Sequence, residues 1–393
     1  MQYARYMTTR NHAQTSPQQS ALHSSQRVSH LAPEIPIVRQ DTPRSAAHTF
    51  IDLASNDYLG LARHPRVQTA AHQAIDQWGV GATGSRVVAG TVPPHHCCEA
   101  KLAGFLGFPA ALLFSSGYLA NLAAITALVP SGATLICDTR NHASLIDACR
   151  LTTAPRIICD VTKPQELAAA LQQATSSVVV CDVVDSTDGS VLDIPSIYHA
   201  THAAGSLLIA DFAHGLGVLG HDGRGALPTL WTNGQAPTDL VITCTLSKAL
   251  GSQGGAVLCS AEQRQHLVNT ARSFIFDTAL AHACAAAATT ALEIIASEPT
   301  RVERLHQHMS ALTNALDLPS VTAGVVAIPL GDPTRAIAVH RTVLSAGVGV
   351  GCFRPPSVPW QRSGLRLGGR ADLSAEQLIR AITVLRDALQ QGN

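Results

Sequence analysis

The sequence predicts an α/β protein with a large, mostly parallel sheet covered by helices on both faces, followed by a smaller α+β domain. Seven short runs follow one another from about residue 110 to 260, and each is apolar on both faces, as strands inside a parallel sheet are. Most intervals between these runs hold helical patterns such as LANLAAITAL and PQELAAALQQA. Beyond about residue 316, three further strand-like runs alternate with two helices, which is typical of an α+β arrangement.

In chain order, the strands expected in the large sheet are AALLF, ATLICD, PRIICD, SVVVCD, SLLIAD, DLVITCT and GAVLCS. The carboxyl ends of parallel strands meet at one edge of a sheet, and ligands bind at that edge. We therefore expect the polar residues Asp138, Asp182, Asp211 and Thr245 to lie side by side there.

The remaining segments follow from pattern and composition. A helical pattern from about residue 279 to 316 predicts a long connecting helix, GVVAIPL, VGVGCF and LRLGG are expected strands, and FRPPSVPWQRSG is an expected loop. The first 33 residues contain no acid and are rich in Ser, Gln, His and Thr, which favours a disordered arm over a transit peptide or a short docking helix. The predicted division is an arm (1–48), a large domain (49–280), and a connector helix with a small domain (281–393).

Composition excludes several classes of function. A formal net charge of zero gives no long-range field to attract nucleic acid or a membrane surface. No apolar run reaches the roughly 18 residues that a membrane span needs. The ten cysteines show no CxxC pair or other zinc spacing, so we expect no metal and a reducing, cytoplasmic location.

Lysine is scarce, and one of the three lysines stands at a strand end. Lys248, in TLSKALGSQGG, follows the expected strand DLVITCT. Desolvation in a crevice at the sheet edge lowers the pKa of a lysine and leaves free amine that can form a Schiff base. A lysine that snorkels from a loop explains this segment equally well on its own.

Residues that could bind a ligand follow two other expected strands. In LLFSSGYLANL a helix begins just after a strand, so its bare N–H groups suit a phosphate, unless a serine simply caps the helix. In SLLIADFAHGLG, Asp211 ends a strand and His214 follows, a pair that can hold a protonated heteroaromatic ring; a capping Asp with a surface His is the alternative. The GxGxxG match GLGVLG is followed by a Gly- and Pro-rich segment instead of a helix, which argues against a dinucleotide.

Together these segments resemble the α-oxoamine synthase family of fold-type I pyridoxal 5′-phosphate (PLP) enzymes. The matching stretches, in family order, are DLASNDYLGLARHP, GATGSRVVAGT, LLFSSGYLANL, NHASLIDACRL, DGS, ADFAHGLGVLG, TLSKALGSQGG, FIFDT and CFRPPSVP. The resemblance implies a PLP-binding large domain and an acyltransferase that condenses L-alanine with a pimeloyl thioester and releases carbon dioxide. It also implies a homodimer with shared active sites.

The resemblance assigns roles around the cofactor ring. Lys248 becomes the residue that links to the PLP aldehyde and the base at the substrate carbon. Asp211 faces the pyridine nitrogen, which keeps the ring an electron sink. His214 and Ser186 face the ring hydroxyl. His142 stacks on the ring, although NHASL could also cap a helix through its asparagine.

The resemblance also assigns the phosphate contacts. They come from the backbone of Gly117 and Tyr118, from the hydroxyl of Thr245, and from Thr278 of a neighbouring subunit.

The amino-acid substrate has its own expected contacts. Arg366 matches the arginine that grips the carboxylate, because a planar guanidinium binds a carboxylate bidentately. Ser357 stands where the family usually has a threonine near the substrate, and Asn56 is expected to contribute across the dimer.

Two departures from the family are visible. The family's Asp-Glu-Ala-His reads Asp211, Phe212, Ala213 and His214 here; strand alternation turns residue 212 away from Asp211, so we expect packing rather than chemistry to change. The segment SHLAPEIPIVRQDTPRSAAHTF has no clear counterpart of the arginine that meets the acyl chain's carboxylate, which leaves the acyl chain and its carrier, coenzyme A or a carrier protein, open.

Two alternatives remain. One is another α-oxoamine synthase that uses glycine or a different acyl thioester. The other is a non-catalytic partner subunit, against which the intact set of Lys248, Asp211 and His214 argues.

Overall fold

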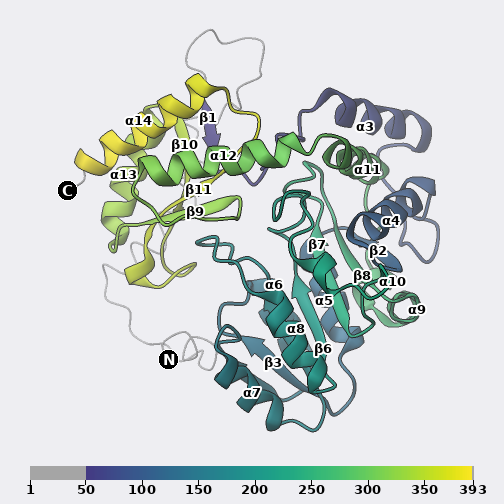
Figure 1. The fold of residues 1–393 in the computed structure, drawn as a ribbon. Helices are drawn as coiled ribbons and strands as arrows, with labels where there is room; N and C mark the ends of the chain where they lie inside the picture. Colours follow the sequence, from purple (N-terminus) through teal and green to yellow (C-terminus); the bar gives the residue numbers. More distant parts are fainter. Residues whose placement is uncertain (1–49, 392–393) are drawn as a thin grey trace, which may run out of the picture.

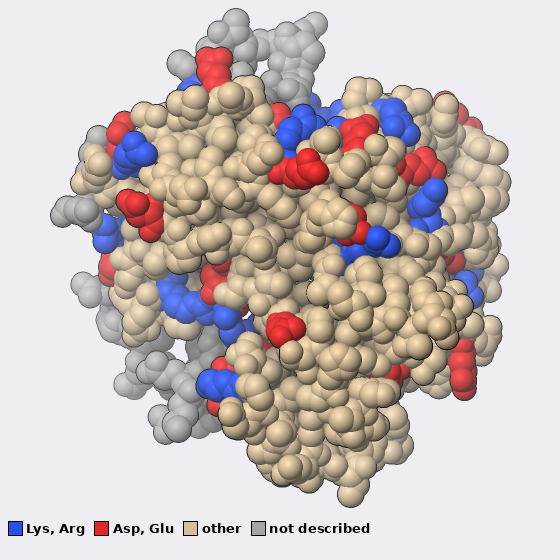
Figure 2. Space-filling view, viewed as in Figure 1, with Lys and Arg blue, Asp and Glu red and all other residues tan. Residues whose placement is uncertain are grey.

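The computed structural model describes residues 50–391, which form two sheets with their helices (Figure 1). The arm predicted for residues 1–48 lies outside the described residues. Among the described residues, no helix is long and apolar enough to cross a membrane. On the face shown in Figure 2, acidic and basic side chains are interspersed, and no large area carries one sign.

The larger sheet contains all seven strands that the apolar runs predict, in the order β2-β8-β7-β6-β5-β3-β4. They are β2 (Ala110–Phe114), β3 (Thr134–Asp138), β4 (Arg156–Cys159), β5 (Ser177–Asp182), β6 (Leu207–Asp211), β7 (Leu240–Thr245) and β8 (Gly255–Cys259). The five strands from β7 to β4 are parallel, whereas β8 runs antiparallel to both β7 and β2.

Alternate residues of these strands enter two hydrophobic cores, one on each face of the sheet. In β5, Val178 and Val180 face one core while Val179 and Cys181 face the other, which explains why the strand is apolar throughout. The helices within residues 50–391 are α3 (Pro65–Trp78), α4 (Pro93–Leu106), α5 (Gly117–Leu128), α6 (Ala143–Leu151), α7 (Pro164–Gln172), α8 (Ile194–Ala203), α9 (Ala261–Thr270), α10 (Arg272–Ile275), α11 (His282–Ser297), α12 (Thr300–Ala315), α13 (Pro333–Ser345) and α14 (Ala375–Gln391), with short 3-10 turns η2 (Leu227–Leu230) and η3 (Trp360–Arg362). Helices α5, α6, α9 and α10 contribute to one core, and α4, α7, α8 and α11 to the other.

The smaller sheet has the order β1-β10-β11-β9 and packs with α12, α13 and α14 (Figure 1). Its strands are β1 (Ile51–Leu53), β9 (Val325–Pro329), β10 (Val348–Phe353) and β11 (Gly364–Gly368). Three of these strands are the ones expected beyond the connector.

Two details differ from the sequence expectations. Residues 51–53, which we placed in the large domain, pair in parallel with β10 of the small sheet. Ile51 and Leu53 are fully buried there, and alternation alone could not reveal that partner. The connector is two helices instead of one: α11 ends at Ser297 and Pro299 precedes α12, because the residue before a proline is pushed out of the helical conformation.

Candidate active site

Two acidic side chains lie at the carboxyl ends of neighbouring parallel strands, as the sequence predicted. Asp182 of β5 and Asp211 of β6 are register partners, and both are buried. Burial, reinforced by the nearby charge of Asp211, raises the pKa of Asp182 well above its usual range. The Asp182 carboxyl accepts a hydrogen bond of 2.6 Å from the backbone N–H of His142, so it also fixes the start of α6.

The Asp211 carboxylate is held by donors. Its Oδ2 accepts a bond of 2.7 Å from Nδ2 of Asn121, and its Oδ1 accepts one of 2.8 Å from the backbone N–H of Ala213. These bonds orient the carboxylate at the sheet edge. Phe212, the departure from the family motif, is 1% exposed and belongs to the hydrophobic core, which confirms that this residue serves packing.

Lys248 lies three residues beyond the end of β7. Burial lowers the pKa of Lys248 to about 8, while the charges of Asp211 and Asp182 oppose this shift. These interactions put the amine near the two carboxylates, and an amine with that pKa is partly unprotonated at neutral pH. The lysine therefore has the environment that an imine-forming nucleophile needs.

His214 is buried and bonded to a residue that the sequence did not suggest. Its Nδ1 lies 2.6 Å from the hydroxyl of Tyr58, and the same hydroxyl donates to Asn56 Oδ1 at 3.1 Å. Burial lowers the pKa of His214 well below its usual range, and the charge of Lys248 adds to this effect. Burial thus favours the neutral form of the His214 imidazole.

Arg366 joins the small sheet to this cluster. From β11 its Nε donates to the carbonyl of Ser186 at 2.6 Å, and its Nη2 donates to Asn56 Oδ1 at 3.0 Å. The guanidinium is buried and lies 5.5 Å from the ring centroid of Phe353. Asn56 was expected to contribute across a dimer, but it contacts Arg366 of its own chain. Ser186 contacts the arginine through its carbonyl.

The start of α5 forms the candidate phosphate site. Ser116 caps this helix by accepting from the N–H of Leu119 at 3.2 Å, and the phosphate site stays a prediction. The N–H groups of Gly117 and Tyr118 precede that bond, in the first turn, where helical N–H groups have no partner within the helix. A Cβ on Gly117 would lie 3.1 Å from Cβ of Thr245, so a side chain at position 117 would crowd Thr245.

His142 itself is the N-cap of α6. Its Nδ1 accepts a bond of 3.2 Å from the N–H of Ser144, whereas Asn141 donates its side-chain amide to the carbonyl of Val180. The asparagine cap that was the alternative for this segment is therefore wrong. Burial and the charge of Lys248 lower the pKa of His142.

Two predicted residues do not join this cluster within one chain. Thr278 is exposed and forms a bridge with Ser85, and Ser357 is exposed in the loop after β10. Three residues that sequence reasoning missed do join it: Asn121, Ser144 and Tyr58. Asn121 was visible as a polar residue in the otherwise apolar LANLAAITAL, and that was the available signal.

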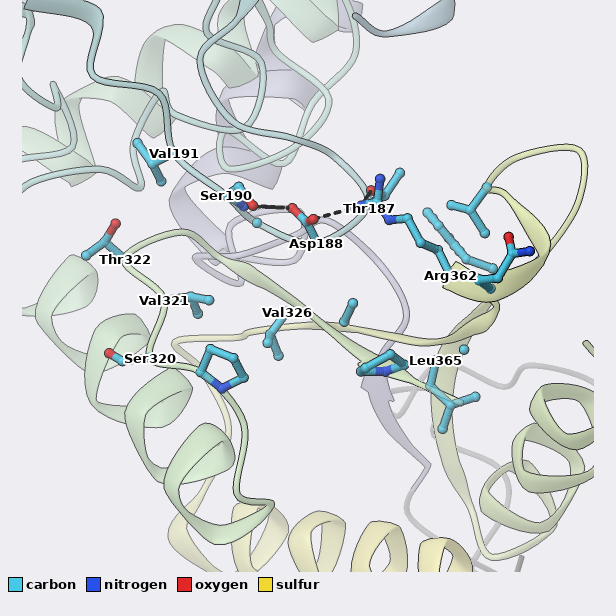
Figure 3. Close-up of a pocket in the computed structure, with 18 residues that line it drawn as sticks. Thr187, Asp188, Ser190, Val191, Ser320, Val321, Thr322, Val326, Arg362 and Leu365 are labelled. Atoms are coloured by element: carbon cyan, nitrogen blue, oxygen red, sulfur yellow. Dashed lines mark hydrogen bonds and ion pairs between the residues drawn. The ribbon is translucent and has the colours of Figure 1, made fainter. Parts of the chain in front are cut away.

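A pocket of about 550 Å³ lies between the loop after β5 and the small sheet (Figure 3). Phe353 lines it, and so does Thr187, which follows the Ser186 that bonds Arg366. Its apolar lining includes Val191, Val321, Val326, Phe353, Val358 and Leu365.

Charged residues stand at one side of this pocket. Arg362 donates to Asp188 at 2.7 Å and to Thr187 at 3.0 Å, and the side chain is 42% exposed. Asp188 also accepts from Arg140 at 2.6 Å, and Arg140 pairs with the buried Asp185. The pocket is thus an apolar space with an arginine at its side.

Comparisons with known proteins identify the family of the chain. Residues 48–385 match the family model of aminotransferase class I and II. A curated relative from Mycolicibacterium vanbaalenii, named 8-amino-7-oxononanoate synthase, is 48% identical over 343 residues, which cover 86% of this chain and 90% of the relative.

Solved structures share the fold. A serine palmitoyltransferase from S. paucimobilis, solved with a bound PLP–myriocin aldimine, has a TM-score of 0.83 and 26% identity, covering 88% of this chain and 89% of its own. An 8-amino-7-oxononanoate synthase from Francisella tularensis has a TM-score of 0.73 and 26% identity, covering 87% of this chain and 98% of its own. The fold is therefore that of the fold-type I PLP enzymes, as predicted.

Proposed function

The chain belongs to the class I and II aminotransferase family, and from this premise we propose that it is an 8-amino-7-oxononanoate synthase of biotin biosynthesis. The reaction joins L-alanine to a pimeloyl thioester and gives 8-amino-7-oxononanoate, carbon dioxide and the free thiol carrier. The observation that carries the proposal is the amine of Lys248, with its lowered pKa, beside the buried carboxylate of Asp211.

The enzyme uses PLP, and the described residues fit that group. Lys248 offers an amine for its aldehyde, Asp211 a carboxylate for its ring nitrogen, and the first turn of α5 offers N–H groups for its phosphate. The glycine at position 117 lets the start of α5 lie close to Thr245. We propose that His142, His214 and Thr245 complete the cofactor contacts.

When bound, PLP supplies an electron sink that stabilises a carbanion at the carbon next to the amino group. Lys248 would hold the cofactor through its amine, and its Nζ would accept the proton from that carbon when the amine is free. Asp211 would accept a hydrogen bond from the protonated ring nitrogen. Its two bonds to Asn121 and Ala213 restrict the rotation of the carboxylate.

Arg366 orients the amino acid. Its guanidinium is fixed by the Ser186 carbonyl and by Asn56, and the remaining N–H groups can grip the substrate carboxylate. A carboxylate held there sets which bond of the substrate carbon points toward Lys248. We propose supporting roles near this substrate for Asn56 and Ser357.

We propose that the pocket beside Arg366 receives the acyl chain of the thioester. Phe353 lines the pocket and its ring lies beside the Arg366 guanidinium, so an acyl chain in the pocket would lie near the amino-acid substrate. Its apolar lining suits the methylene chain, and Arg362 suits the terminal carboxylate of a pimeloyl group.

We propose a homodimer in the cytoplasm. Thr278 bridges to Ser85, and around this bridge three large hydrophobic side chains are strongly exposed: Val80 at 76%, Val88 at 83% and Phe276 at 71%. Such side chains favour contact with a second copy, and Thr278 would then reach the neighbour's phosphate site. The ten cysteines are all free thiols, which is typical of a reducing compartment.

Carbon dioxide release from L-alanine, measured with a panel of acyl thioesters, tests this function. We expect release with the pimeloyl thioester and little with glycine in place of L-alanine. Lys248→Ala should abolish release and the visible absorption of the bound cofactor while the protein stays folded by circular dichroism. Release with glycine and another thioester would instead identify a different α-oxoamine synthase, and activity only in the presence of a homologue would identify a partner subunit.

A further inference from the structure

Two neutral side chains join Asp211 to His142 through hydrogen bonds. Nδ2 of Asn121 lies 2.7 Å from Oδ2 of Asp211 and 2.8 Å from Oγ of Ser144. Oγ of Ser144 lies 2.8 Å from Nδ1 of His142. Asn121 is 2% exposed and Ser144 1%, so water does not compete for these bonds.

The orientation of the Asn121 amide is forced. A carboxylate can only accept, so the amide nitrogen must face Asp211. The amide oxygen then faces Thr243, whose hydroxyl donates to it at 2.5 Å. One amide hydrogen goes to Asp211, and the other goes to Ser144.

The hydrogen bonds of Ser144 determine which ring nitrogen of His142 carries the proton. Because Ser144 Oγ accepts from Asn121, its single hydroxyl proton is free to go to Nδ1 of His142. The backbone N–H of Ser144 points at the same Nδ1, at 3.2 Å. Two donors at Nδ1 leave no place for a hydrogen on that nitrogen, so the neutral imidazole carries its proton on Nε2.

We propose that Asn121 and Ser144 are positioning residues that hold His142 as the neutral, Nε2-protonated imidazole. The inference goes beyond the proposed function, since it concerns this chain with or without a cofactor. A ring held in this way gains a proton at Nδ1 only by losing two hydrogen bonds. It therefore leaves the role of proton acceptor to Lys248.

The burial of His142 and the charges around it together lower its pKa. Partial burial lowers the pKa of His142, Lys248 lowers it further, and Asp211 and Asp147 oppose the shift. The carboxyl of Asp182 accepts from the backbone N–H of His142, and burial raises the pKa of this carboxyl. The hydrogen-bond network and the burial thus both favour the uncharged ring.

The test is ¹⁵N NMR of the full chain labelled with ¹⁵N-histidine, both cofactor-free and loaded with PLP. A His142→Gln spectrum identifies the His142 signals. We expect an unprotonated Nδ1 and a protonated Nε2 in the unsubstituted protein. In Asn121→Asp the Ser144 hydroxyl gains a carboxylate to donate to, so the Nδ1 proton should appear and the ring should take up its second proton at higher pH.

Ser144 offers a matched pair of variants and a control. Ser144→Ala should shift the tautomer and the titration in the same direction as Asn121→Asp, and Ser144→Thr, which keeps the hydroxyl, should preserve both. Ser177→Ala should change neither, because Ser177 is equally buried but bonds Ser206 at the opposite end of β5. A protonated Nδ1 in the unsubstituted protein, or equal spectra for Ser144→Ala and Ser177→Ala, would overturn the proposal.

Discussion

Nε of Arg366 donates a hydrogen bond of 2.6 Å to the carbonyl oxygen of Ser186, and this bond joins β11 of the small sheet to the loop after β5 of the large one. The guanidinium is therefore placed by the backbone of one domain and carried by a strand of the other. A lysine cannot make this bond and the Asn56 bond together with a bidentate grip on a ligand.

Arg366→Lys should therefore weaken the binding of the amino acid more than that of the thioester. Hydrogen bonds to charged groups contribute about 1.5 to 3 kcal/mol each, so we expect KM for L-alanine to rise roughly tenfold to a hundredfold. Steady-state kinetics with each substrate varied in turn measures the two KM values. An unchanged KM for L-alanine in a folded variant would exclude Arg366 as the carboxylate site.

The second prediction concerns pH. The pKa of Lys248 is lowered to about 8, so its amine loses its proton as the pH rises through about 8, whereas an ordinary lysine does so near 10.5. Covalent linkage of added PLP to the cofactor-free protein should therefore speed up through about pH 8. Stopped-flow absorption measures the rate, and a midpoint near that of an ordinary lysine would contradict the prediction.

Asp211→Asn tests the effect of a neighbouring charge on the pKa of Lys248. The charge of Asp211 raises the pKa of Lys248 against the effect of burial, so its removal should move the midpoint to lower pH. Asp222→Asn, at a carboxylate that pairs with Arg224 and is not one of the charges that shift the pKa of Lys248, should leave the midpoint unchanged.

Much of this fold could be predicted because strands buried on both faces are apolar throughout, so each run from AALLF to GAVLCS forms a strand. The strand ends then placed Asp211 and Lys248 at one edge. The pairing of β1 with β10 was not predictable, because the alternation of apolar and polar residues identifies a strand but not the strand with which it pairs.

The sequence also did not show which side chains hydrogen-bond to the site residues. Asn121 lies on a helix, Ser144 on another and Tyr58 in a loop, and nothing in their spacing shows that they face Asp211, His142 and His214. Such contacts depend on how helices pack on the sheet. They follow from the three-dimensional arrangement alone.

The third prediction tests the pocket. Arg362→Ala should raise KM for a pimeloyl thioester about two- to fivefold, because a partly exposed ion pair contributes up to about 1 kcal/mol. KM for a heptanoyl thioester, which lacks the terminal carboxylate, should not change. Arg224→Ala is the matched control, since Arg224 is 39% exposed against 42% for Arg362 and also pairs with an aspartate. Equal changes of KM for both thioesters would show that Arg362 does not bind the terminal carboxylate of the pimeloyl group.

The last prediction separates packing from chemistry at Phe212. The ring is 1% exposed, and a Cβ on Gly215 would lie 2.2 Å from its Cε2, so the turn after β6 is shaped around it. Phe212→Ala should lower the free energy of unfolding by about 3 to 5 kcal/mol in urea titrations. Leu151→Ala, at a side chain that is 65% exposed, should change it by no more than about 0.5 kcal/mol.

The pH midpoint of PLP linkage decides whether Phe212 also affects the chemistry. If the ring only fills the core, Phe212→Ala should leave this midpoint near 8 at urea concentrations below the unfolding transition, because Asp211 and its two donors are unchanged. Phe212→Glu, which restores the family's residue, should destabilise the protein more than alanine does, since it puts a carboxylate where no hydrogen-bond partner awaits it. A midpoint that moves in Phe212→Ala would mean that the ring sets the environment of Lys248 as well as the packing of the turn.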